Sequence, residues 1–242
     1  MLEAAFWGFV GGAALLLGAA VGLLWTVPRR VIGLVMAFGG GVLVSAVAFE
    51  LTAEAVKGGG WDATAAGLAA GSLAFFLGDR ALARRGGEDR KRSTGPGQNA
   101  AALGIVLGAI LDGIPESAAI GISLLDGEGV SVAVVVAVFL SNVPESMSAA
   151  AGLRATWSRG KILGLWAGVA VISALAAAAG YGVLGDLAGD WVAFTQAFAA
   201  GAILTMLADT MFPEAFEAEG RSPLTGVVTT LGFAVSALLS SV

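Results

Sequence analysis

Two copies of a Pro-Glu-Ser core, LDGIPESAA (Leu111–Ala119) and LSNVPESMSAA (Leu140–Ala150), lie close together near the middle of this chain. Each copy interrupts a long apolar stretch with a proline and with acidic or amide side chains. A charged side chain at the centre of a membrane costs about 2.5–3.5 kcal/mol on insertion scales, so such residues are rare and usually functional. The duplication therefore predicts two facing, proline-interrupted membrane helices that share one polar site.

The composition around these motifs is that of a membrane protein. The chain has 242 residues, of which 57% are hydrophobic and only 13% are charged, whereas soluble domains are about 25% charged. Its 37 glycines suit membrane helices, because small residues let helix backbones pack closely. Cysteine and histidine are both absent, which excludes disulfides, thiolate metal sites and imidazole ligands.

Stretches of about 20 apolar residues are long enough to cross a bilayer. Eight such stretches predict an all-α integral membrane protein with eight transmembrane helices, and we expect residues 1–242 to form a single transmembrane domain. A polar cytoplasmic loop is expected at 83–99. The predicted spans are approximately 4–25, 31–55, 61–82, 100–125, 130–153, 161–184, 192–213 and 222–241.

The basic residues predict the orientation of these spans. Twelve of the thirteen Lys and Arg residues fall in one alternating set of loops, and Lys57 is the exception. Loops rich in Lys and Arg are cytoplasmic by the positive-inside rule. We therefore expect a multi-pass protein with both termini outside the cell; Ala-, Gly- and Arg-rich usage suggests a prokaryotic cytoplasmic membrane.

A second internal similarity pairs GVLVSAVAFELTAEA (Gly41–Ala55) with GAILTMLADTMFPEA (Gly201–Ala215). Aligned without gaps, Gly41 meets Gly201, and the two segments fall in spans of opposite direction. The same holds for the two Pro-Glu-Ser cores. Together they predict a 3+2+3 inverted-repeat bundle, an arrangement typical of transporters whose sites lie between the repeats.

The candidate metal ligands are Asp112, Glu116, Ser141, Asn142 and Glu145. Asp112 and Glu116 are four residues apart, so they share one face of a helix. Glu145 follows Asn142 by three residues and Ser141 by four, which gives the opposing helix the same arrangement. Carboxylate, amide and hydroxyl oxygens suit hard or borderline divalent cations.

The prolines predict further oxygen donors. Pro115 cannot bond to the carbonyl of Leu111, and Pro144 cannot bond to that of Leu140, because proline has no N–H group. Both helices are expected to kink there and to free these two carbonyls for the site.

Five other carboxylates are second-rank candidates for entrance and exit. Glu50 and Glu54 lie toward the outer end of span two, and Asp209, Glu214 and Glu217 lie toward the inner end of span seven. Glu50 and Asp209 sit deeper, which favours a role in the pathway. For Glu54, Glu214 and Glu217, a solvated interfacial position is an equally good interpretation.

At its paired motifs, the chain resembles the ZIP (Zrt/Irt-like) family of divalent metal transporters, prokaryotic type. The matching stretches are DGIPES (Asp112–Ser117), SNVPES (Ser141–Ser146) and the Pro-Glu of Phe212–Glu214. The resemblance implies eight spans in a 3+2+3 plan, uptake toward the cytoplasm, a possible homodimer, and metal binding by Glu116 and Glu145.

The chain departs from the family pattern at two positions. Asp112 stands where the family has histidine, and Gly113 stands where it has asparagine. These changes predict one all-oxygen site, which makes Mn²⁺ or Fe²⁺ more competitive with Zn²⁺ or Cd²⁺. The divalent metal ion is expected as the transported substrate; membrane lipid is the other expected partner, and neither an organic cofactor nor nucleic acid is expected.

Three other interpretations use the same carboxylates. A proton-linked or monovalent-cation permease is the main alternative, because protons also neutralise buried acids. An intramembrane enzyme is disfavoured, since the sequence offers no nucleophile–base pair and no phosphate-binding loop, so no enzymatic activity is expected. Purely structural packing leaves the duplicated core unexplained.

Overall fold

The computed structural model describes residues 1–84, 98–126, 129–184, 189–219 and 224–240. This part of the chain is helical and contains no strand, which confirms the predicted all-helical fold class. Most of the polar loop predicted at 83–99 lies outside the described residues, although Gln98 already begins a helix. The elements are α1 (Leu2–Leu24), α2 (Arg29–Ala46), η1 (Val47–Thr52), α3 (Ala53–Leu82), α4 (Gln98–Ile122), η3 (Ser123–Asp126), α5 (Val132–Leu153), α6 (Arg159–Leu184), α7 (Gly189–Met206), η4 (Leu207–Met211), α8 (Phe212–Glu219) and α9 (Leu224–Leu239).

Six helical stretches among the described residues are long and apolar enough to cross a membrane. The longest, Arg29–Leu82, contains 54 residues and joins α2, η1 and α3. α9 is apolar but shorter, with 16 residues. Helices satisfy their own backbone hydrogen bonds, as a chain in lipid requires. The lengths and apolar character are compatible with a multi-pass membrane protein.

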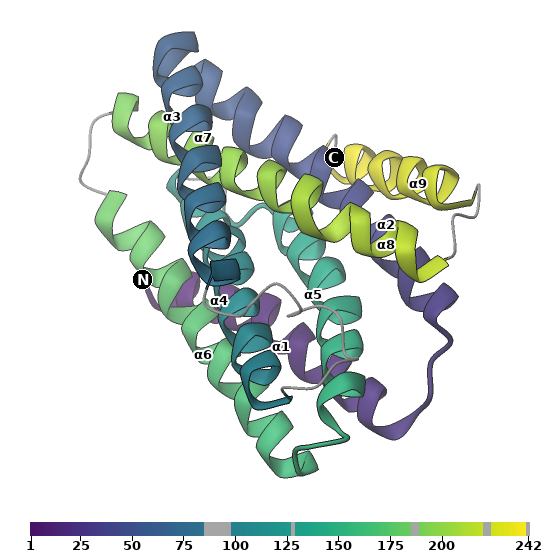
Figure 1. The fold of residues 1–242 in the computed structure, drawn as a ribbon. Helices are drawn as coiled ribbons and strands as arrows, with labels where there is room; N and C mark the ends of the chain where they lie inside the picture. The colour runs from purple at the N-terminus through teal and green to yellow at the C-terminus, as the bar shows by residue number, and fades with distance from the viewer. Residues whose placement is uncertain (85–97, 127–128, 185–188, 220–223, 241–242) are drawn as a thin grey trace.

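Gly60 divides the longest stretch into two helices. Its φ of 72° and ψ of −176° are not helical, and a positive φ is a conformation that glycine adopts more readily than other residues. The hydroxyl of Thr64 donates to the Gly60 carbonyl oxygen over 2.7 Å at the start of the next helix. The chain changes direction at this point, between the stretches predicted at 31–55 and 61–82 (Figure 1).

Two of the elements are π-helices inside longer helical stretches. η1 follows α2, and η4 follows α7. Each widens the helix locally, because a π-helix bonds to the fifth residue along rather than the fourth, and such turns are frequent at functional sites.

The helices pack in two groups (Figure 1). In the first group, α1 packs along α5 and α6, and α4 packs along α6. In the second group, α3 packs along α7, and α9 packs along α2. The groups meet mainly where α2 contacts α5 and where α4 contacts α7.

Glycines bring α2 and α9 into close backbone contact. A Cβ atom at Gly41 would lie 1.9 Å from the carbonyl oxygen of Thr229, and one at Gly232 would lie 2.1 Å from that of Phe38. No real Cβ atom can approach an oxygen so closely, so both positions require glycine.

The contact between α7 and α3 has the same form. A Cβ atom at Gly201 would lie 2.2 Å from the carbonyl oxygen of Leu68, and one at Gly71 would lie 1.9 Å from that of Phe198. Small residues at membrane helix contacts allow this spacing. The two helix pairs of the second group are therefore held by matching glycine contacts.

Candidate functional site

A contact between α4 and α5 forms the centre of the candidate site. The hydroxyl oxygen of Ser141 lies 3.1 Å from Oε1 of Glu116, to which it donates, and 2.9 Å from the carbonyl oxygen of Val138. The exposed fraction is 2% for Glu116 and 3% for Ser141. A carboxyl group and a hydroxyl group from the two duplicated motifs thus meet inside an apolar bundle.

Asp112 extends this contact along α4. It lies one turn before Glu116 on the same helix, and it is also 2% exposed. The next turn of α4 carries Ala119 and Ile120, which are fully buried in the apolar core. The two acidic side chains are therefore shielded from water by packing, and they lie one turn apart as their four-residue spacing predicts.

On α5, the predicted ligands have different partners. The Asn142 amide nitrogen donates to the Gly11 carbonyl oxygen of α1 over 3.1 Å. Glu145 is half-buried, one turn beyond Ser141. Glu116 and Ser141 are therefore in direct contact, whereas the amide nitrogen of Asn142 is directed toward α1.

The two prolines lie within helices that continue on both sides. Pro115 is inside α4 and Pro144 is inside α5. A Cβ atom at Gly39 of α2 would lie 3.1 Å from the carbonyl oxygen of Leu140, which Pro144 leaves without its helical donor. This oxygen therefore lies where the two helix groups meet.

The donor chemistry fits a divalent cation, but the arrangement is open. Among the described residues, no three acidic side chains lie close enough together to hold a metal ion. Asp112, Glu116 and Glu145 thus do not form a closed carboxylate cage in this conformation. The donors are nonetheless all oxygens, which suits hard and borderline cations. An ion here would take its remaining ligands from water or from a rearranged α5.

Two second-rank candidates, Glu50 and Glu54, line a pocket of about 850 Å³, here named the η1 pocket. Glu50 accepts a hydrogen bond of 2.5 Å from the Ser131 hydroxyl, and Glu54 pairs with Lys57 over 2.5 Å. The polar residues of the pocket come from η1, α3, the α4–α5 connection and the end of α9: Glu50, Glu54, Lys57, Ser123, Ser131 and Ser240.

Two residues that the sequence did not indicate as part of the site are Ser131 and Ser123. The backbone N–H of Ser131 donates to the Ser123 hydroxyl over 3.1 Å, and that hydroxyl donates to the Ile120 carbonyl over 2.9 Å. Ser131 also accepts from the N–H of Val134 and so caps α5. A serine just before an apolar helix is the usual signal for such a cap, but nothing in the sequence indicated its bond to Glu50.

The remaining second-rank candidates lie near the end of α7. Glu214 is half-buried, and its Oε1 lies 3.4 Å from the Ser148 hydroxyl of α5. Asp209 and Glu217 are both exposed on the surface of the bundle. The buried residues of η4 are Leu207, Thr210 and Met211, so Asp209 lies on the opposite face.

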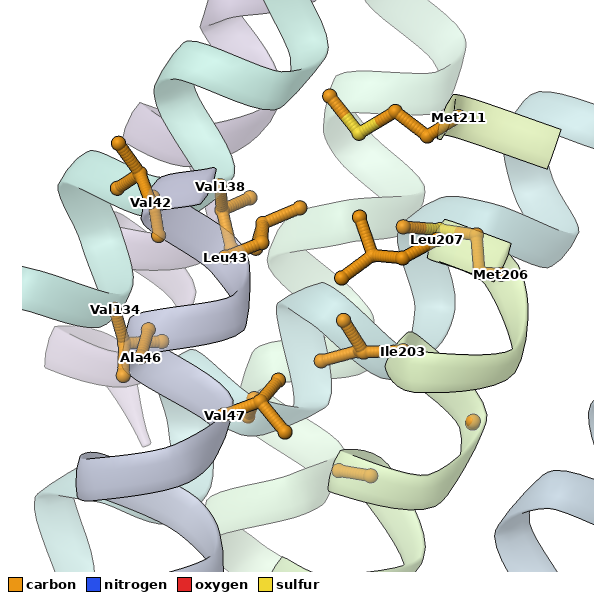
Figure 2. Packing of buried hydrophobic residues seen from close by; sticks show 14 of the residues in the cluster. Val42, Leu43, Ala46, Val47, Val134, Val138, Ile203, Met206, Leu207 and Met211 are labelled. Carbon is orange, nitrogen blue, oxygen red and sulfur yellow. The ribbon is translucent and has the colours of Figure 1, made fainter. Parts of the chain in front are cut away.

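An apolar layer lies between the η1 pocket and the central contact. Ser131, Val134, Val138 and Ser141 follow one face of α5, with the two serines about 15 Å apart at 1.5 Å per residue. Figure 2 shows the two valines beside Val42, Leu43, Ala46 and Val47 of α2 and η1, with Ile203, Met206, Leu207 and Met211 of α7 and η4 beyond. In this conformation the layer separates the two polar regions.

Two further buried serines lie on α2 and α6. Ser45 of α2 is fully buried, and its hydroxyl has no hydrogen-bond partner among the described residues. Ser173 of α6 is also buried, and its hydroxyl lies 3.9 Å from where a Cβ of Gly113 would be. In the ungapped alignment of Gly41 with Gly201, Ser45 meets Thr205, which was the one signal in the sequence for Ser45. Nothing in the sequence indicated Ser173.

Comparison of the chain with protein-family models gives no match, and comparison with curated proteins gives no match either.

Proposed function

We propose that this protein carries divalent metal ions across a membrane. This is the function of the ZIP family, whose motifs the chain resembles. The observation that carries the proposal is the buried contact between Glu116 and Ser141, with Asp112 one turn away. Acidic groups at this depth are costly unless they serve an ion or a proton. Uptake toward the cytoplasm, with both termini outside, is the proposed direction.

The direct test is metal uptake by vesicles that contain the purified protein. Transport that survives removal of the Glu116 or Glu145 carboxylate would refute the central site. Uptake of protons or Na⁺ without any divalent metal would favour the permease alternative.

An inverted 3+2+3 repeat is part of the proposal, and the π-helices support it. In the ungapped alignment of Gly41 with Gly201, residue 47 meets residue 207. η1 begins at Val47 and η4 begins at Leu207, so the two π-helices start at equivalent positions. A rare element at the same place in two similar segments is best explained by duplication.

The packing supports the same symmetry. The proposed repeat makes α1 equivalent to α6, α2 to α7, α3 to α9 and α4 to α5. Under this exchange the α3–α7 contact becomes the α9–α2 contact, and the α1–α5 contact becomes the α6–α4 contact. All four of these contacts are present. Phe38 and Phe198, each three residues before the aligned glycine, supply equivalent carbonyl oxygens. Inverted repeats let one fold open to either side of a membrane.

The mechanism we propose is movement of one helix group against the other. The η1 pocket would receive the ion, and the apolar layer around Val138 and Leu43 would part to let it reach Glu116. Because Val138 and Leu43 belong to different groups, a relative shift of the groups opens that layer without unfolding a helix.

The all-oxygen site predicts broad selectivity among divalent metals. We expect Mn²⁺ and Fe²⁺ to halve the uptake of labelled Zn²⁺ at concentrations within about tenfold of the concentration at which unlabelled Zn²⁺ halves it. The reason is that the site lacks the imidazole and thiolate ligands that favour zinc. A competition series with Zn²⁺, Mn²⁺, Fe²⁺, Cd²⁺ and Ca²⁺ measures this. Preference for Zn²⁺ or Cd²⁺ by more than about a hundredfold would contradict the assigned ligands.

Glu50 is expected to act in capture of the ion rather than in its passage. Glu50→Gln should raise the KM for metal uptake several-fold and leave the maximal rate nearly unchanged, because a negative pocket concentrates cations near its mouth. The amide oxygen can still accept the Ser131 hydrogen bond. Glu3→Gln, which neutralises an exposed acid on α1, is the control, and an equal KM in both variants would exclude this role.

A further inference from the structure

The connection between α5 and α6 carries an unbalanced positive charge. Arg154, Arg159 and Lys161 are all exposed, and the chain has no acidic residue from 146 to 185. Within the described part of the chain, none of the three makes a salt bridge to a carboxylate. This corner can therefore accept an anionic partner.

Trp157 indicates the depth at which we expect the corner to lie in a membrane. It is partly buried against the cluster that contains Leu153, Ile162 and Trp166, and the Lys161 ammonium lies 3.8 Å from the centroid of its ring. Tryptophan and lysine together are typical of the interface where lipid headgroups lie. We therefore expect the three positive charges to lie at the level of the lipid phosphate groups.

Next to the corner, the exposed face of α6 has a recess where it carries glycines instead of larger side chains. Gly160, Gly164 and Gly168 are exposed, and a Cβ at any of them would meet no atom within 4 Å. They lie on one face at four-residue spacing, over about 12 Å of helix. Further along the same face, Val171 and Leu175 are large and exposed. The recess is therefore confined to the half of α6 that adjoins the basic corner.

We propose that the corner and the recess bind one anionic phospholipid. The headgroup phosphate contacts Arg159, Lys161 and Arg154, and an acyl chain lies in the recess over Gly164. Each Lys or Arg near an anionic lipid favours binding measurably, and the exposed glycines allow an acyl chain to approach the helix backbone.

Charge also distinguishes this occupant from a second copy of the chain. Two copies in one membrane have the same orientation, so a symmetric pair formed along α6 would bring their recesses together in parallel. Arg159 and Lys161 of one copy would then lie opposite those of the other copy, within about one helical turn of the point where the two α6 helices cross. Like charges repel at this distance, whereas a phospholipid phosphate is attracted.

The test is native mass spectrometry of the full protein with added dioleoyl-phosphatidylglycerol or dioleoyl-phosphatidylcholine. Arg159→Gln/Lys161→Gln is expected to weaken phosphatidylglycerol binding about tenfold and to leave phosphatidylcholine binding unchanged. The matched control is Arg80→Gln/Arg84→Gln, which removes the same charge from the end of α3. Arg80 resembles Lys161 in that it contacts an aromatic ring, Phe76. The exposed face of α3 beside it carries large side chains such as Leu77, so the control site offers basic charge beside a filled helix face. Equal losses in the two double variants would overturn the proposal in favour of general surface charge.

Gly164→Leu tests the recess, because it fills an exposed position where an added Cβ would meet no atom within 4 Å. It should weaken phosphatidylglycerol binding several-fold, while Gly226→Leu, at an equally open exposed position on α9, should not. If neither Gly164→Leu nor Gly226→Leu alters phosphatidylglycerol binding, the protein holds only a headgroup or a free phosphate and no acyl chain. A wild-type dimer that Gly164→Leu dissociates would mean that a second copy fills the recess. Either result would refute the lipid site.

Discussion

Glu116→Gln is expected to abolish metal transport, with uptake reduced at least about a hundredfold, while the protein remains folded. The substitution keeps the shape of the side chain and its ability to accept the Ser141 hydrogen bond, but it removes the negative charge. A divalent ion that loses its hydration shell in an apolar bundle needs anionic oxygens in return. We therefore expect the loss to appear in the maximal rate, measured as metal accumulation in vesicles.

The folded state of the same variant should be as stable as wild type or more stable. A buried carboxylate without its ion is costly, so neutralising it removes an unfavourable term, and the midpoint of thermal unfolding should be unchanged or higher. Ser141→Ala is the partner variant, because it removes the hydroxyl and leaves the charge. We expect it to retain part of the transport. Full transport by Glu116→Gln, or unfolding of that variant, would each contradict the assigned role.

Gly41→Ala and Gly201→Ala are expected to be among the most destabilising single-methyl additions in this chain, each by on the order of 3 kcal/mol. The added Cβ atoms would lie 1.9 Å and 2.2 Å from the backbone oxygens of Thr229 and Leu68. A backbone carbonyl cannot rotate away as a side chain can, so the helices must separate. Thermal unfolding followed by circular dichroism measures the effect.

The controls for these glycines are Gly164→Ala and Gly226→Ala, whose new Cβ atoms meet no atom within 4 Å. They should be neutral or slightly stabilising, because alanine is the better helix former. The two test variants should also lose similar amounts of stability, since the proposed repeat makes their positions equivalent. Indistinguishable midpoints for all four variants would contradict the close helix contacts.

Several features were predictable from the sequence because they depend on local patterns. The helical stretches follow from runs of apolar residues long enough to cross a membrane, and the break near Gly60 falls between two such runs. The position of Asp112 and Glu116 on one helix face follows from their four-residue spacing. The pairing of Gly41 with Gly201 was visible in the aligned letters, and the two π-helices at equivalent positions agree with it.

Other features depended on which helices pack together. The bond of Glu50 to Ser131 joins residues 81 positions apart, and no local pattern relates them. The exposure of Asp209 depends on the rotation of η4, which turns Leu207 and Met211 inward.

The sequence by itself determined a helical, membrane-compatible chain with a duplicated acidic core, because hydropathy and helical periodicity act over neighbouring residues. The tertiary structure decided which acidic groups meet, and that an apolar layer separates Glu116 from Glu50. Those outcomes depend on the crossing points of helices, which are fixed by glycines such as Gly41 against distant backbone carbonyls. Such contacts arise only when the whole bundle has assembled.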